Sequence, residues 1–67
     1  MTIPEIILYT RKARGLSQQR LGELCGYTGK MAELSIHYWE NGKRPIPINR
    51  IRPLAKALEL PIDMLIP

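Results

Sequence analysis

The sequence predicts an all-α protein, a compact bundle of about five short helices that forms a single domain, residues 1–67. Apolar residues recur at helical spacing along most of the chain. Glycine, Asn-Gly and proline divide it at short intervals. The only alternating stretch, Ile46-Pro47-Ile48, contains a proline that a paired strand would not tolerate. A chain of this length holds one small domain.

The first predicted helix ends at Gly15, a residue suited to the end of a helix. Thr2 or Ile3 is the expected N-cap. Pro4 suits the opening of a helix, because the N–H that proline lacks would have no partner there.

The second predicted helix begins after Ser17, a good N-cap, and closes at Gly26. Gly22 lies in its middle, where glycine costs roughly 1 kcal/mol relative to alanine. Such a glycine predicts that another backbone comes close. The expected buried face consists of Leu16, Leu21, Leu24 and Cys25.

The third predicted helix runs from Thr28 to Glu40 and stops at Asn41-Gly42. Ala32, Ile36 and Trp39 share one face at i, i+4, i+7 spacing, which predicts that Trp39 belongs to the core.

The fourth predicted helix contains Pro53 among apolar residues at helical spacing. If Asn49 is the N-cap, Pro53 falls at the fourth helical position, where no intrahelical N–H bond is yet required. An earlier, kinked start is the alternative. A last short turn follows Pro61, and Leu65 is expected to fill the core.

The chain is basic, with ten Lys and Arg against six Asp and Glu and a formal net charge of +4. Such an excess favours an anionic partner, of which nucleic acid is the commonest. The sequence contains no paired carboxylates, phosphate-cradling glycine loop or metal-ligand spacing. We therefore expect no enzyme activity, no cofactor, no metal and no small-molecule ligand.

The single cysteine, Cys25, cannot form an internal disulfide and suits a reducing compartment. The apolar stretch at residues 6–8 is too short for a signal peptide or a membrane span. These features predict a cytoplasmic protein without a membrane partner.

Four short motifs occur in a characteristic order along the chain: Arg14–Gln18, Leu21–Gly26, Trp39–Arg44 and Leu54–Leu58. In this order the sequence resembles the Cro and C1 (phage-repressor, XRE-like) family of helix-turn-helix proteins. The resemblance covers nearly the whole chain. It implies a lambda-repressor-like fold whose third helix enters the major groove. It also implies sequence-specific binding of double-stranded DNA by a transcriptional regulator, a repressor.

The resemblance also implies roles for individual residues. A buried pair, Arg11 and Glu40, would tie the first helix to the end of the third. The expected phosphate contacts are Gln18, Asn41, Lys43 and Arg44. Arg50 and Arg52, near a helix N-terminus, are either further phosphate contacts or solvated charges. The expected base-reading residues, which lie off the apolar face of the third helix, are Lys30, Glu33, Leu34, His37 and Tyr38.

The sequence departs from the family between Gly26 and Glu40, where it is about four residues longer, close to one helical turn. Either the third helix begins a turn earlier, or the turn is a longer loop that Gly29 interrupts. Gly22 also replaces the usual alanine of the second helix.

The C-terminal run, residues 61–67, is apolar with a single charge. Ile62, Met64 and Ile66 cannot all point inward, so they predict the surface of a weak homodimer. A two-fold dimer would place two recognition helices about 34 Å apart. The alternative is a monomer whose tail packs on its own core.

The rival function is that of a protein-interaction module such as an antitoxin. Salt-sensitive binding to duplex DNA would exclude this rival function.

Overall fold

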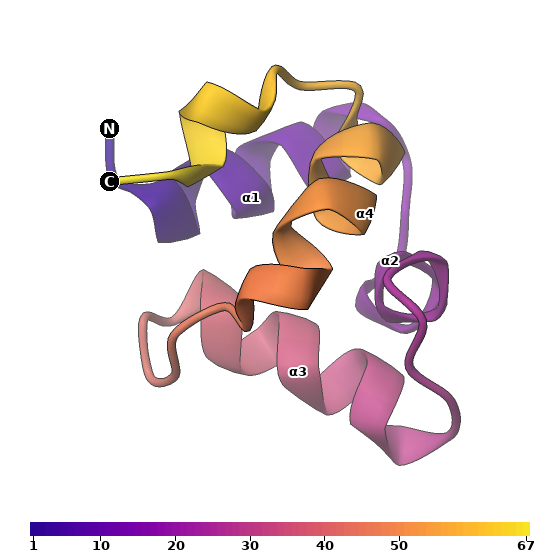
Figure 1. The fold of residues 1–67 in the computed structure, drawn as a ribbon. Helices are drawn as coiled ribbons and strands as arrows, with labels where there is room; N and C mark the ends of the chain where they lie inside the picture. Colours follow the sequence, from indigo (N-terminus) through magenta and orange to yellow (C-terminus); the bar gives the residue numbers. More distant parts are fainter.

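The structure, a computed structural model, describes all 67 residues as four α-helices followed by one 3-10 helix, without strands. The elements are α1 (Ile3–Ala13), α2 (Gln18–Leu24), α3 (Lys30–Glu40), α4 (Ile48–Leu58) and η1 (Ile62–Leu65). Figure 1 shows α1 and η1 at one end of the molecule and α3 at the other, with α4 between them. The all-α prediction is confirmed, and the last of the expected short helices is the 3-10 helix.

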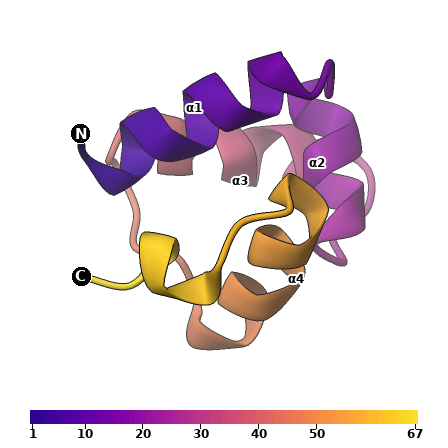
Figure 2. The same cartoon turned by 90° about the horizontal axis from the view of Figure 1, so that it is seen from above.

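A single core receives side chains from every element. Its buried members are Ile7, Leu21, Cys25, Ile36, Trp39, Leu54, Ala55, Leu58 and Leu65. From above, α1, α2, α4 and η1 surround this core and α3 lies beneath it (Figure 2). Trp39 and Leu65 are 4% and 1% exposed, which confirms that both are core residues.

The starts of α1 and α2 are capped as the sequence predicts. Thr2 is the N-cap of α1, and its side chain and that of Glu5 each accept a hydrogen bond from the other's backbone N–H. Ser17 caps α2, where its Oγ accepts a hydrogen bond from the N–H of Arg20 at 2.9 Å. These two helix starts are therefore fixed by local side chains.

Helices α2 and α3 meet at Gly22. A Cβ placed on Gly22 would lie 2.0 Å from the carbonyl oxygen of Ala32, which is closer than two non-bonded atoms can approach. The close backbone approach predicted from this glycine is confirmed.

Leu24 is 40% exposed, so its assignment to the buried face of α2 is wrong. The buried arc of α2 runs from Leu21 through Cys25 to Gly22. At about 100° per residue, Leu24 falls beyond the edge of this arc. It borders an open groove between α2 and α4.

Helix α3 begins at Lys30, two residues later than the sequence predicts. Its N-cap is Gly29, which has φ +58° and offers no side-chain hydrogen bond to the helix. Thr28 lies before the cap. The turn between α2 and α3 therefore covers residues 25–29, and Gly29 closes it.

Helix α4 begins at Ile48, with Pro47 as its N-cap, so the prediction that Asn49 caps it is wrong. The earlier start, the alternative from the sequence, is the one observed. Pro53 consequently lies inside the helix, where it cannot donate to the carbonyl of Asn49. Asn49 is exposed.

Candidate nucleic-acid interface

The outer face of α3 lies opposite the side that packs on the core. The buried residues of α3 are Ala32, Ser35, Ile36 and Trp39. Among the predicted base-reading residues, four are exposed and Tyr38 is partly buried; the exposed ones are Lys30, Glu33, Leu34 and His37. The structure thus presents this predicted set on one side of one helix.

The loop after α3 is tied back onto this helix. The N–H of Lys43 donates to the carbonyl of Tyr38 at 2.9 Å. The guanidinium carbon of Arg44 lies 4.5 Å from the centre of the Tyr38 ring, a cation–π contact. The Lys43 side chain is exposed and forms no ion pair. Two cations are therefore held beside the outer face of α3.

Arg11 and Glu40 form a buried ion pair, whose side chains are 11% and 4% exposed. Nη2 of Arg11 donates to Oε1 of Glu40 at 3.1 Å, and its Nη1 donates to the carbonyl of Leu16 at 2.9 Å. The expected tie between α1 and the end of α3 is thus present. All buried side-chain polar atoms have hydrogen-bond partners.

The amides of Gln18 and Asn41, residues expected at phosphates, donate hydrogen bonds to other groups of the protein. Nε2 of Gln18 donates to Oε1 of Glu40 at 3.0 Å and so joins the buried pair. Nδ2 of Asn41 donates to the carbonyl of His37 at 2.7 Å, which caps the end of α3. The Gln18 amide thus ties α2 to the end of α3, whereas the Asn41 amide completes the end of α3 itself.

Arg50 is partly buried, and its guanidinium contacts other groups of the protein. Its Nη1 donates to the carbonyl of Cys25 at 2.9 Å, and its guanidinium carbon lies 4.3 Å from the centre of the Tyr27 ring. Tyr27 in turn meets Trp39 edge-on at 5.9 Å. A carbonyl at a helix C-terminus attracts a cation, so Arg50 fastens the turn between α2 and α3 to α4.

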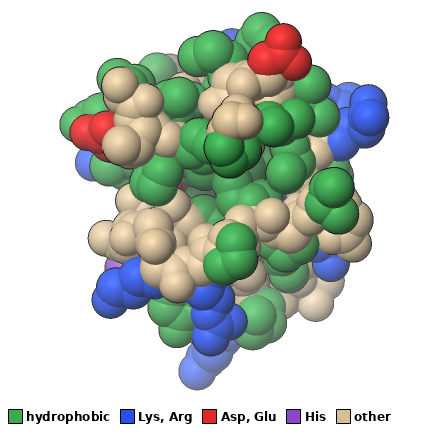
Figure 3. All heavy atoms as spheres, turned by 60° about the vertical axis from the view of Figure 1, so that its left-hand side comes forward, with side chains coloured by type: hydrophobic (Ala, Val, Ile, Leu, Met, Phe, Trp, Pro, Cys, Tyr) green, Lys and Arg blue, Asp and Glu red, His purple; other side chains and the backbone are tan.

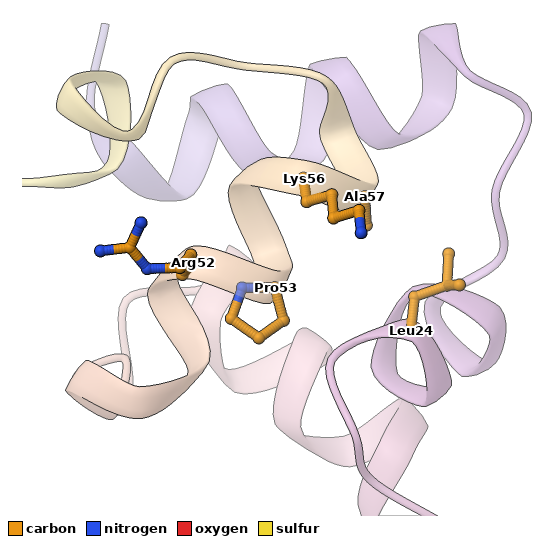
Figure 4. A pocket seen from close by; sticks show the side chains of 5 residues that line it. All are labelled: Leu24, Arg52, Pro53, Lys56 and Ala57. Atoms are coloured by element: carbon orange, nitrogen blue, oxygen red, sulfur yellow. The ribbon is translucent and has the colours of Figure 1, made fainter.

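Arg52 lies away from α3, at a groove of about 600 Å³ between α2 and α4. Figure 4 shows this groove, with Leu24 on the α2 side and the remaining lining residues on α4. The α4 residues are Arg52, Pro53, Lys56 and Ala57. Neither cation of the groove forms an ion pair. The structure therefore does not bring Arg52 together with Lys43 and Arg44.

Two residues near the outer face of α3 were missed in the sequence. Met31 is 48% exposed on α3. Nε2 of Gln19 donates to the carbonyl of Gly29 at 3.2 Å, which ties α2 to the start of α3. The spacing of Met31 to Leu34 and Tyr38, i, i+3 and i+7, could have identified Met31 as a neighbour of the predicted set.

Charge is unevenly distributed on the face that carries the loop after α3. In Figure 3, Lys and Arg side chains lie at the lower edge, level with α3, and also at the upper right, while the acidic side chains in view lie only in the upper half. Lys30, Lys43 and Arg44 have no acidic partner. This arrangement suits contact with a row of phosphates.

No helix is long and apolar enough to cross a membrane. No group of three or more His, Cys, Asp or Glu is placed to hold a metal ion.

The chain matches no curated protein and no solved structure at a significant level of similarity. A family model described as helix-turn-helix matches residues 7–65, nearly the whole chain. The chain therefore belongs to the Cro/C1-type helix-turn-helix family of DNA-binding regulators.

Proposed function

We propose that this regulator is a repressor that binds a specific sequence of double-stranded DNA and acts in the cytoplasm. The observation that carries the proposal is the set of three unpaired cations, Lys30, Lys43 and Arg44, that border the exposed face of α3. Helix α3 lies in the major groove, where side chains meet the edges of bases. Lys43 and Arg44 contact phosphates.

The base-reading residues in this proposal are Lys30, Glu33, Leu34, His37 and Tyr38. Lys30 can donate to guanine O6 and N7, and Glu33 can accept from cytosine N4. Behind this surface, Gln18 and the Arg11–Glu40 pair fix the end of α3. A helix held this firmly meets DNA with little loss of conformational freedom, which favours affinity.

We also propose a weak homodimer, which the exposed side chains of Met64 (45%) and Ile66 (49%) support. Ile62, the third residue expected in this surface, is only partly exposed and packs against the core. We therefore assign the dimer surface to Met64 and Ile66. Two copies related by a two-fold axis would read a near-palindromic site.

Selection of duplexes from a random pool by the purified chain tests this function. A DNA-binding regulator enriches a defined sequence, and its affinity falls steeply as salt rises because phosphate contacts release counterions. A chain that enriches no sequence and shows no salt-dependent retention of duplex DNA would not have this function.

A second candidate is a protein-interaction module such as an antitoxin. The groove between α2 and α4 favours it, because Leu24 is 40% exposed there and Arg52 and Lys56 are unpaired. A stable protein partner that is retained through purification, together with failure of the duplex selection, would favour this function over the first.

A further inference from the structure

Met31, Leu34 and Tyr38 form one continuous strip on the outer surface of α3, here called the apolar row. Their spacing of three and four residues stacks them along one side of the helix. Met31 is 48% exposed and Leu34 is 39% exposed. Tyr38 is partly buried beside the loop that follows α3. No other element of the fold covers Met31 or Leu34.

Cations stand at both ends of the apolar row. Lys30, the first residue of α3, adjoins Met31 and forms no ion pair. At the other end, the guanidinium carbon of Arg44 lies 4.5 Å from the centre of the Tyr38 ring. The partner that fits this surface is therefore apolar along its middle and negatively charged along its edges.

Helix α3 has few side chains that could read bases by paired hydrogen bonds. It contains no Arg, Asn or Gln, and Lys30 is its only side chain that can make a bidentate contact with guanine. Asn41, just beyond its end, uses its amide on the carbonyl of His37. Apart from Lys30, Glu33 and His37, discrimination on this face therefore depends on apolar contact.

Thymine presents the matching group in the major groove. Its C5-methyl projects there between two lines of phosphates, and apolar side chains recognise it by contact. Met31 and Tyr38 are seven residues apart, which at 1.5 Å per residue is about 10 Å along the helix. That length corresponds to about three bases at 3.4 Å per base.

We propose that the apolar row recognises the C5-methyl groups of successive thymines, so that the preferred half-site contains a short run of T. This inference rests on the proposed function and specifies how the site is read. It also adds Met31 to the base-reading set. Because 5-methylcytosine carries a methyl group at the same ring position, the row recognises it in the same way.

The test begins with the duplex obtained by selection and replaces its thymines one at a time with deoxyuridine. This change deletes one methyl group and leaves base pairing intact. The dissociation constant should rise about fourfold for each contacted methyl, the factor that about 0.8 kcal/mol per buried CH₂-sized group gives. At one of these positions a C·G pair should weaken binding, and 5-methylcytosine should restore most of the loss.

Two leucine variants identify the side chain that makes the contact. Leu34→Ala should bind more weakly and lose its response to deoxyuridine at one position. Leu24→Ala is the matched control, because Leu24 is exposed to nearly the same extent, 40% against 39%, but lies on α2. It should keep the full response. Circular dichroism melts check that both variants fold.

Three results would overturn the inference. If the wild-type chain prefers one sequence but binds its thymine and deoxyuridine forms equally, methyl recognition is wrong and the proposed function stands. If the chain prefers no duplex, the inference and the proposed function fall together. A selected site without thymine opposite α3 would also overturn methyl recognition.

Discussion

Gly22 shows how a single missing side chain sets the distance between two helices. Its Cα faces the backbone of Ala32, and a methyl group there would overlap the Ala32 carbonyl. Glycine is normally a poor choice inside a helix, by roughly 1 kcal/mol relative to alanine. Here the close contact of α2 and α3 outweighs that preference, and it also fixes the register in which α3 lies.

Gly22→Ala should therefore destabilise the protein, although alanine favours helix. We expect a loss of about 1–3 kcal/mol, the usual cost of forcing an extra methyl into a packed site. Urea unfolding followed by circular dichroism measures it as a lower midpoint with an unchanged slope. A raised midpoint would show that α2 and α3 are not in backbone contact at this residue.

Local signals in the sequence predicted those features that depend on neighbouring residues. Thr2 and Ser17 cap their helices because their hydroxyls reach an N–H three residues ahead. The contacts of Arg50 could not be predicted in this way, because its hydrogen-bond partner, the carbonyl of Cys25, is distant in the sequence. The sequence shows only a cation near a helix start, and tertiary structure decides what it binds.

The start of α3 also depends on contacts between residues far apart in the sequence. Thr28 is the better local N-cap, yet Gly29 occupies that position with a positive φ. The contact between Gly22 and Ala32, together with the Arg50 contact to the preceding turn, fixes where the helix begins. The outer face of α3 was predictable because its periodicity is local. Met31 lies in the first turn of α3, and only the tertiary structure shows that its side chain is exposed there.

The loop after α3 supplies the sharpest test of phosphate binding. Lys43→Ala should weaken binding about equally on all sequences and lower the slope of log K against log salt by roughly 1. Fluorescence anisotropy of labelled duplexes at several salt concentrations measures both effects. Lys12→Ala, an exposed cation on α1, removes the same charge and should change the slope little. A changed sequence preference with an unchanged slope in Lys43→Ala would contradict the phosphate assignment.

The domain is small, with principal extents of 28 × 23 × 19 Å. Figure 1 shows η1 and α1 together at the end of the molecule remote from α3. In the proposed dimer, each such domain would cover one short half-site. Affinity for a longer site then depends on a second copy, because joining two half-sites makes the second contact effectively intramolecular.

Self-association through the C-terminal surface is therefore a prediction about the assembled regulator. Sedimentation at rising concentration should show a weak dimer, strengthened by a near-palindromic duplex with half-sites about 34 Å apart. Met64→Asp and Ile66→Asp should abolish it, because a buried carboxylate is costly. Leu24→Asp, at an exposed leucine on α2, should not. A strict monomer that gains nothing from a second half-site would contradict the dimer.

The buried thiol of Cys25 can be used to measure how often the hydrophobic core opens. The thiol is 1% exposed, and burial raises its pKa to about 11, above the ordinary value of 9.0. The unfolded chain thus loses this proton first, so the thiol's contribution to stability is intact below pH 9 and declines as pH rises from 9 towards 11. Cys25→Ala should lack that decline.

In the native protein an alkylating reagent can react with Cys25 only when the core opens, because the reactive thiolate is suppressed while the thiol stays buried. The rate of this reaction, measured with and without the selected duplex, would therefore show how far DNA binding reduces opening of the core.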